Sequence, residues 1–314
     1  MRIGIIGIGI MGEYHVRVYS EIAKNNVDVH LAGIADIDKN RVEGIARKYG
    51  TTAYTDYNEL LGSRMDAVSI CVPTSMHYKV AIEAIQKGIR HLLIEKPISD
   101  NLTNANDIVK FARDKGVTIS VGHVERFNPA VLLMKKIIDS ERLGRVVSIS
   151  AKRVGPGPPK HKDTGVIVDL AVHDMDIISY LFSASPTDIY AFAGEGENGL
   201  EDRASIIMRF SDQRAGTLDT NWLTARRVRT LDLVGLQAVA HLDYIDQTII
   251  ISEHEKDEEI KFVKQEPLMK ELMHFINVVR GNEKPLVTGE EGIMALRMAL
   301  AAVKSYKTGE VQKI

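Results

Sequence analysis

At 314 residues the chain is about twice the usual length of a domain, so one large or two medium domains are expected. Its 45% hydrophobic and 26% charged residues are typical of a globular protein, and the net charge of −2 gives no reason to expect nucleic acid or a membrane as partner. The single cysteine, Cys71, excludes an internal disulfide and a cysteine-rich metal site. No apolar run approaches the roughly 18–20 residues of a membrane span, so we expect a cytoplasmic protein.

The N-terminal segment carries a dinucleotide-binding fingerprint. Residues 1–7 form an apolar run that predicts a buried strand, and a helical pattern follows to Ala23. The pattern G-x-G-x-x-G lies between them and comprises Gly7, Gly9, Ile10, Met11 and Gly12. Its glycines permit a tight turn, close approach of the backbone to a pyrophosphate, and close helix–strand packing. Because a helix N-terminus also attracts phosphate, the motif predicts a cofactor site.

An acid ends the second expected strand, Val27–Ala35. A carboxylate at Asp36 can accept both ribose hydroxyls and repels a 2′-phosphate, so NAD is favoured over NADP. Lys39 and Arg41 lie near enough to tolerate a 2′-phosphate, which keeps NADP open. Asp36 has a second interpretation, as the residue that merely starts the helix from about Asp38 to Tyr49.

Strands and helices go on alternating as far as residue 125. The further strand patterns, which predict βαβ units and a parallel sheet, are Thr51–Tyr54, Asp66–Val72, Leu92–Glu95 and Val117–Gly122. Pro73, Thr74 and His77 follow the fourth strand, and this loop is expected to lie against the nicotinamide half of the cofactor. His77 is as well explained by a structural role, since the helix start offers it backbone partners.

The strand Leu92–Glu95 ends abruptly in Glu95, Lys96 and Pro97. Ligands of parallel sheets bind beyond the carboxyl ends of the strands, so Lys96 is a candidate catalytic residue and Glu95 its anchor. Proline cannot extend the strand pairing, and the Lys96–Pro97 bond is a candidate cis peptide. The alternative is a strand that ends at a solvated turn.

Basic residues gather where the alternation stops. The loop Gly155–Pro159 is flanked by Arg153 and Lys160, whose charges suit an anionic substrate group. A solvated surface loop is the alternative. We also expect Arg126, which follows the first domain, to contact the substrate.

A second candidate site lies in the helical pattern of residues 165–183. Asp169 and His173 are four residues apart, so they share a helix face, and a carboxylate can orient an imidazole for general acid–base work. A structural contact is the alternative, while zinc would need a further ligand that no motif supplies. Asp174 is expected to face solvent, and Asp176 to support the site or contact substrate.

The second half of the chain predicts a largely antiparallel sheet. Six strand patterns follow one another with few helices between them, at 188–193, 204–210, 215–221, 228–234, 239–242 and 248–251. Two amphipathic helices, Leu268–Arg280 and about Glu290–Lys307, end the chain. We therefore expect a Rossmann domain at 1–125 and an α+β domain with a large open-faced sheet at 126–314. The uncovered face predicts a homodimer or homotetramer, which a monomer in light scattering would contradict.

Together these motifs resemble the glucose–fructose oxidoreductase/inositol dehydrogenase/MocA family over essentially the whole chain. The resemblance rests on the glycine fingerprint, on residues 72–77, on Glu95-Lys96-Pro97, and on the spacing of Asp169, His173 and Asp176. It implies an NAD(P)-dependent dehydrogenase that interconverts an alcohol and a ketone on a sugar. It further implies that Lys96 lies beside the nicotinamide and the substrate hydroxyl, with His173 as general acid–base and Asp169 as its partner.

A narrower resemblance concerns the substrate. Residues 121–129, 153–156 and 169–174 resemble the subgroup of this family that oxidises nucleotide sugars of the UDP-N-acetylglucosamine type. The alternatives are a dehydrogenase of a free sugar, a cyclitol or a small diol, and a non-catalytic regulator that keeps the cofactor fold. Retention of Lys96, Asp169 and His173 together argues against the regulator.

Overall fold

The structure is a computed structural model that describes residues 1–157, 164–197 and 199–314. The chain divides into two compact units, Met1–Val124 with Glu266–Ile293, and Glu125–Gln265 with Met294–Ile314. The last division falls inside helix α9 (Gly289–Thr308). The expected domains, 1–125 and 126–314, omit the return of residues 266–293 to the first unit.

A parallel six-stranded sheet forms the centre of the first unit, with strand order β3-β2-β1-β4-β5-β6 in this fully described part of the chain. The order reverses between β1 and β4, and ligands of doubly wound sheets bind beyond the strand ends at such a reversal. The expected Rossmann sheet is thus confirmed. Its strands are β1 (Arg2–Ile6), β2 (His30–Ala35), β3 (Ala53–Tyr54), β4 (Ala67–Ile70), β5 (His91–Glu95) and β6 (Thr118–Gly122).

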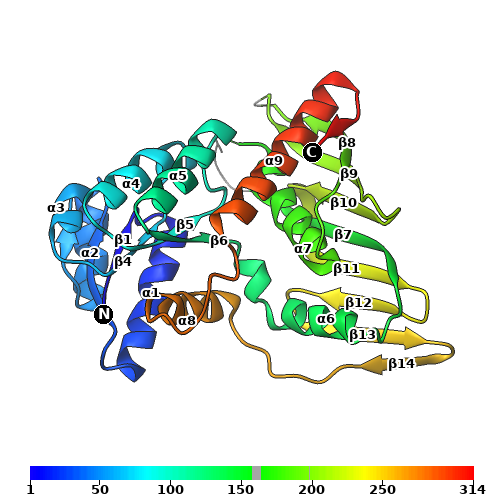
Figure 1. Cartoon of the computed structure of the whole chain (residues 1–314), viewed down its shortest axis with the longest axis horizontal. Helices are drawn as coiled ribbons and strands as arrows, with labels where there is room; N and C mark the ends of the chain where they lie inside the picture. Colours follow the sequence, from blue (N-terminus) through cyan, green and yellow to red (C-terminus); the bar gives the residue numbers. More distant parts are fainter. Residues whose placement is uncertain (158–163, 198) are drawn as a thin grey trace. The chain divides into compact units, whose positions relative to one another are not determined.

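Helices cover both faces of this sheet, with α4 and α5 on one side and α1 and α8 on the other (Figure 1). The helices of the unit are α1 (Ile10–Asn25), α2 (Lys39–Tyr49), α3 (Tyr57–Gly62), α4 (Thr74–Gln86), α5 (Leu102–Asp114) and α8 (Pro267–Val279). Helix α8 buries Leu268, Leu272, Phe275 and Ile276 in the same apolar cluster as Tyr19 of α1. The late segment therefore completes the core of the first unit.

The second unit is built on a mixed sheet, nine-stranded over the described residues, in the order β14-β13-β12-β11-β7-β10-β9-β8-β15. Among the strand pairs of this sheet in the described residues, only β7 and β10 run parallel, so the mostly antiparallel sheet is confirmed. Its strands are β7 (Val146–Pro156), β8 (Asp188–Glu195), β9 (Glu201–Arg209), β10 (Ala215–Asn221), β11 (Leu223–Gly235), β12 (Val239–Asp243), β13 (Thr248–Glu253), β14 (Lys256–Glu259) and β15 (Gln312–Lys313).

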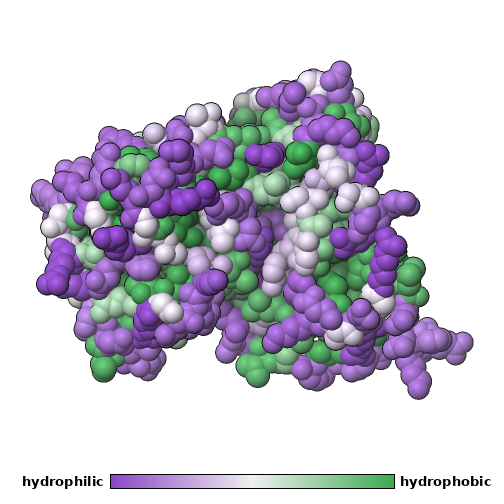
Figure 2. All heavy atoms as spheres, viewed as in Figure 1, coloured by the Kyte–Doolittle hydropathy of each residue, from purple (hydrophilic) through white to green (hydrophobic). Residues whose placement is uncertain are grey.

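One face of this sheet packs against helices. Its apolar core joins the inward side chains of the strands to α6 (Pro129–Asp139), α7 (Val172–Phe182) and the last turns of α9. Strand β9 alternates buried and exposed residues because its other face carries no helix of the core. Exposed apolar side chains on that face include Phe192, Ile207 and Ile250. Figure 2 shows apolar patches among the polar atoms of the visible surface. Self-association through this sheet stays a prediction.

Two strands and two short helices have no clear signal in the sequence. Strand β14 consists of four exposed charged residues, and β15 has only two residues, so neither shows an apolar alternation. A 3₁₀ turn, η1 (Val124–Phe127), and a π-helical turn, η2 (Ile167–Ala171), lie where a coil and a regular α-helix are expected. Within the described ranges, no helix is both long and apolar enough to cross a bilayer.

Candidate active site

The glycine motif lies at the switch point of the parallel sheet. Gly7 has φ 89°, and a Cβ atom there would lie 2.6 Å from the Val72 nitrogen. A Cβ atom on Gly12 would lie 1.9 Å from the Gly7 carbonyl oxygen, so these two glycines are required by the turn itself. A Cβ atom on Gly9 would meet no atom within 4 Å. Gly9 is therefore not explained by packing, and its open space fits a group that approaches the backbone.

The start of α1 presents backbone donors to that space. Gly9 is the N-cap of α1 and no side chain caps the helix, which leaves its first amides available to an anion. Asp36 lies beside them, because its carboxylate accepts hydrogen bonds from the Ile8 nitrogen at 2.6 Å and the Asp38 nitrogen at 2.8 Å. These residues fit the pyrophosphate and ribose of a dinucleotide, with Ile10 and Met11 in the first turn of the helix.

The loops after β4 and β5 are joined by His77. Its Nδ1 lies 2.9 Å from the Pro97 oxygen and its Nε2 lies 2.9 Å from the Val72 oxygen. The ring is only 1% exposed, and burial lowers its pKa. His77 thus positions the loop that carries Pro73 and Thr74 against the loop after Lys96; a direct contact of these residues with the cofactor stays a prediction.

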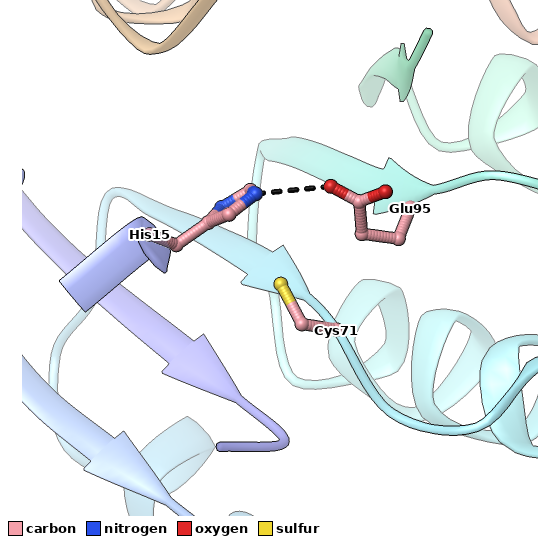
Figure 3. A group of neighbouring side chains, drawn as sticks. All are labelled: His15, Cys71 and Glu95. Atoms are coloured by element: carbon pink, nitrogen blue, oxygen red, sulfur yellow. Dashed lines mark hydrogen bonds and ion pairs between the residues drawn. The ribbon is translucent and has the colours of Figure 1, made fainter. Parts of the chain in front are cut away.

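Glu95 is held at the end of β5 by buried partners. Its Oε1 lies 2.9 Å from Nε2 of His15 on α1 (Figure 3). Its Oε2 accepts the backbone N–H of Lys96 at 3.3 Å. A Cβ atom on Gly122, the residue paired with it on β6, would lie 2.9 Å from the carboxylate. Burial opposes the charged form of Glu95, but the hydrogen bond and charge of His15 and the charge of Lys96 keep its pKa low.

A second buried acid, Glu271 of α8, faces Glu95. Glu271 is 1% exposed, and within the described residues neither of its carboxyl oxygens has a hydrogen-bond partner. Burial, and then the charge of Glu95, raise its pKa well above the ordinary value. Glu271 therefore keeps its proton to a higher pH than an exposed glutamate does.

A metal ion is the alternative explanation for part of this cluster. One ligand atom each of His15, Cys71 and Glu95 lie within 4.8 Å of one another (Figure 3). However, Nε2 of His15 is already hydrogen-bonded to Oε1 of Glu95 at 2.9 Å, so each atom has a partner without a metal. The hydrogen-bonded His15–Glu95 pair is the better interpretation.

Lys96 directly follows the buried Glu95 at the end of β5. Its side chain is half-buried, directly after Glu95, and the Lys96–Pro97 peptide is cis. The residue is thus fixed on its N-terminal side by the Glu95 contacts and on its C-terminal side by the His77–Pro97 hydrogen bond. A rigidly held lysine beyond the carboxyl end of a parallel strand is suited to contact a bound ligand.

In the second unit, His173 follows the π turn. The Val172 N–H bonds back to the Ile167 oxygen, five residues earlier, which widens the helix just before His173. Such turns occur often at functional sites. Asp169 lies inside the turn, and both it and His173 are half-buried while their neighbours Ala171 and Val172 are buried. Glu201 of β9 fixes the start of the turn by accepting the Ile167 N–H at 3.3 Å.

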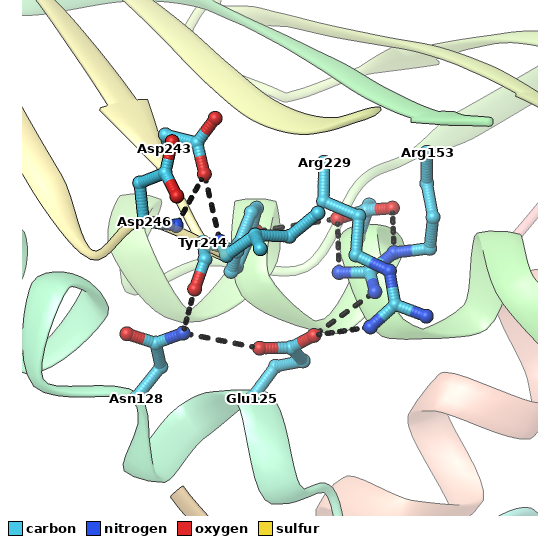
Figure 4. A network of polar contacts seen from close by, with 9 residues as sticks. Glu125, Asn128, Arg153, Arg229, Asp243, Tyr244 and Asp246 are labelled. Atoms are coloured by element: carbon cyan, nitrogen blue, oxygen red, sulfur yellow. Dashed lines mark hydrogen bonds and ion pairs between the residues drawn. The ribbon is translucent and has the colours of Figure 1, made fainter. Parts of the chain in front are cut away.

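From the sequence, Asp174 is expected to face solvent, and this expectation is wrong. Asp174 is 2% exposed and is bound to Arg153. Arg153 donates to its two oxygens at 2.6 and 3.0 Å and to Glu125 at 2.9 Å (Figure 4). The Tyr244 hydroxyl also donates to Asp174 at 3.2 Å. Burial opposes the charge of Arg153, yet Asp174 and Glu125 hold its pKa well above the ordinary value. This network ties β7 to the start of α7.

Arg126 and Asp176 form a second buried pair. Arg126 donates to both oxygens of Asp176 at 2.8 and 2.7 Å and lies 4.7 Å from the centre of the Tyr180 ring. These contacts favour a structural role for both residues, and substrate contact by either stays a prediction. Lys160 lies outside the described residues.

A hollow of about 320 Å³ opens beside Asp169 within the second unit. Its lining includes the charged side chains Arg153, Arg227, Arg229 and Asp169, together with Trp222. The sequence motifs include Arg153 and Asp169 but miss Arg227 and Arg229 of β11, and Trp222 between β10 and β11, because this stretch predicts only the approach to a strand. The hollow is large enough for part of a small ligand.

Two family models match the chain. The model of an "Oxidoreductase family, NAD-binding Rossmann fold" matches residues 1–123, and that of a "GFO/IDH/MocA C-terminal domain" matches residues 131–241. The chain belongs to the glucose–fructose oxidoreductase/inositol dehydrogenase/MocA family. The first unit is thus an NAD-binding domain, and the expected NAD(P)-dependent dehydrogenase that acts on CH–OH groups is confirmed.

Relatives in this family have different substrates. The chain is 27% identical over 310 residues to UDP-N-acetylglucosamine 3-dehydrogenase of Acidithiobacillus ferrooxidans, covering 96% of this chain and 95% of that protein. The structure of that enzyme matches with a TM-score of 0.89 over 98% of both chains. Myo-inositol 2-dehydrogenase of Thermotoga maritima is also 27% identical, over 331 residues that cover 98% and 96%. WlbA dehydrogenase of Bordetella pertussis, in complex with NADH and UDP-GlcNAcA, shares the fold (TM-score 0.85, 21% identity, 100% and 98% covered).

The sequence gives only weak indications that certain acidic residues near the candidate site are buried. Glu271 stands in the apolar stripe of α8, next to Leu272, and an acid in such a stripe suggests a buried group. Asp174 likewise stands in a mostly apolar helix. Glu125 and Glu201 give no comparable signal, because their burial depends on partners far away in the sequence.

We predict that Gly9→Ala weakens NAD binding without destabilising the fold. The added methyl group has open space in the free protein, but it occupies the place where the cofactor pyrophosphate would approach the protein backbone. A loss of about tenfold or more in affinity, on the order of 1.4 kcal/mol, is expected in a calorimetric titration. Gly44→Ala in α2 is the matched control, because its methyl group also meets nothing within 4 Å. Unchanged NAD affinity in Gly9→Ala would contradict the cofactor site.

We predict that Glu271→Gln raises the melting temperature at pH 8 more than at pH 4.5. The folded pKa of Glu271 lies above the unfolded value, so wild-type stability is fully present below the unfolded pKa and is lost as the pH rises toward the folded pKa. Glutamine resembles the neutral acid and escapes this loss. Thermal unfolding across this pH range should show the gap widening, while the exposed control Glu255→Gln shows a flat difference. A constant gap for Glu271→Gln would exclude the raised pKa.

Proposed function

We propose that the protein oxidises a secondary hydroxyl of a nucleotide sugar of the UDP-N-acetylglucosamine type, with NAD as the acceptor. The hollow beside Asp169 carries the proposal, because Arg227 and Arg229 line it in addition to the acid-bound Arg153, and inositol has no charge to match these two arginines. The relative from A. ferrooxidans, which is named for such a substrate, supports the choice.

His173 acts as the general base in this proposal. Its imidazole takes up the proton of the substrate hydroxyl, and the carboxylate of Asp169 orients the ring and stabilises the imidazolium. The support comes from this segment itself. The π turn carries Asp169, His173 follows it, and both side chains are half-exposed, whereas Ala171 and Val172 between them are buried.

Lys96 donates a hydrogen bond to the reacting oxygen and stabilises the negative charge that develops there. The Glu95 contacts and the His77–Pro97 hydrogen bond hold its backbone in place. NAD, when bound, supplies the hydride acceptor, and Gly7, Gly9, Gly12 and Asp36 would hold it. The carboxylate of Asp36, beside the glycine motif, favours NAD over NADP because it would repel a 2′-phosphate.

A dehydrogenase of a free sugar, a cyclitol or a diol is the second candidate, supported by the equal identity to an inositol dehydrogenase. It differs from the first in that it gives no role to the arginines of β11. A regulator without activity is not favoured, since the similar proteins named for UDP-N-acetylglucosamine and for inositol are dehydrogenases.

We predict turnover of UDP-N-acetylglucosamine and none of myo-inositol. Only the anionic substrate gains from the arginine-lined hollow. The purified protein is incubated with NAD or NADP and each of UDP-N-acetylglucosamine, UDP-glucose, glucose and myo-inositol, and reduction of the cofactor is followed by absorbance. Turnover of inositol or glucose with none of either UDP-sugar would establish the second candidate instead.

We predict that Lys96→Ala and His173→Asn each lower kcat about 10²- to 10⁴-fold, the range for loss of a general acid–base or charge-stabilising group. NAD affinity should stay within a fewfold of wild type for His173→Asn, because its role concerns the substrate proton. The matched controls Lys87→Ala and His254→Asn replace exposed residues and should turn over normally. Near-normal kcat in either test variant would overturn the role given to that residue.

A further inference from the structure

The arginines of β11 lie where strand pairing is irregular. The pairing of β11 with β7 shifts between Leu223 and Val228, which leaves the stretch between them outside the regular ladder. Arg227 from this stretch packs against the end of β7, since a Cβ atom on Gly155 would lie 3.4 Å from its Cα. Arg227 and Arg229 both line the hollow beside Asp169, whereas Arg226 is exposed and does not.

The positive charges of Arg227 and Arg229 are neutralised by fewer carboxylates than the charge of Arg153 is. Arg229 lies 3.6 Å from Oε1 of Glu125, the same oxygen that Arg153 already holds at 2.9 Å (Figure 4). No ion pair holds Arg227 within the part of the chain that the structure describes. Burial, and then the neighbouring Arg153, lower the pKa of Arg229. An anion in the hollow would balance this excess of positive charge.

Trp222 gives the same hollow an aromatic surface. It is half-buried, and a Cβ atom on Gly157 would lie 3.0 Å from its Cβ, so glycine lets the loop after β7 approach the side chain closely. Aromatic side chains stack on nucleobases, and arginines bind phosphate groups through paired N–H donors. Trp222, Arg227 and Arg229 therefore combine the two chemistries that a nucleoside diphosphate offers.

We infer that this hollow is the subsite for the nucleoside diphosphate of the substrate, with Arg227 and Arg229 on the diphosphate and Trp222 on the base. The inference rests on the proposed function, because it concerns the part of the same nucleotide sugar that does not react. It goes further because it assigns nucleotide binding to the arginines of β11. Arg126 and Arg153 are not assigned this role, since their donors are bound to buried acids.

Fluorescence can observe this subsite directly, because Trp222 is the only tryptophan of the chain. The full-length protein without added NAD is titrated with UDP, with uridine and with inorganic pyrophosphate. UDP is expected to change the tryptophan emission and to bind tighter than uridine. Pyrophosphate is expected to compete with UDP. UDP binding should also weaken as the salt concentration rises, because the contacts are charged.

Two substitutions test whether the arginines of β11 bind the diphosphate. Arg227→Gln and Arg229→Gln are each expected to weaken UDP binding about ten- to hundredfold, the effect of losing a charge-assisted hydrogen bond. Arg226→Gln, the exposed neighbour on the same strand, is the matched control and should bind UDP as wild type does. Thermal unfolding of each variant separates a local effect from misfolding, and Arg227 is itself exposed, so its replacement should leave the fold intact.

The outcomes separate the subsite from the proposed function. Absence of UDP binding to the wild type, or UDP binding that both variants retain, would overturn the subsite while leaving sugar oxidation to the substrate assay. Loss of UDP binding in the variants supports the subsite even if no UDP-sugar is oxidised, in which case the proposed function alone fails.

Discussion

The site in the second unit depends on a single buried guanidinium, that of Arg153. Removing such a charge from water is strongly unfavourable unless acids surround it, and here Asp174 and Glu125 provide them. Because Arg153 belongs to β7 and Asp174 to α7, the ion pair fixes where the helix begins relative to the sheet. The position of His173, one residue earlier, follows from that contact.

A similar logic operates in the first unit, where the pKa values of two buried acids near Lys96 shift in opposite directions. His15 lowers the pKa of Glu95, whereas burial and the charge of Glu95 raise the pKa of Glu271. Two like acids in one apolar region tend to ionise at different pH, since the charge of one opposes the charge of the other. Gly122 makes room for the arrangement, which explains a glycine at the end of β6 that no turn requires.

The sequence predicts those parts of the molecule that are determined locally. The six strands of the parallel sheet, the glycine turn and the acid at Asp36 all depend on patterns within a few neighbouring residues, and their structure agrees. The π turn and the burial of Asp174 are not local, because Asp174 owes its state to a partner 21 residues away. The hollow at β11 is missed for the same reason: its arginines gain meaning only beside the loop after β7.

The return of α8 to the first unit has a consequence for the order of synthesis. The segment Glu266–Ile293 supplies Leu272 and Phe275 to the core around α1, so the ribosome must complete more than two hundred residues before that core can close. Until then the nascent N-terminal segment exposes the apolar side of α1 and lacks a part of its own interior. The cofactor domain, although encoded first, is thus finished late, and a truncated chain ending before α8 would carry the complete glycine motif on an incomplete fold.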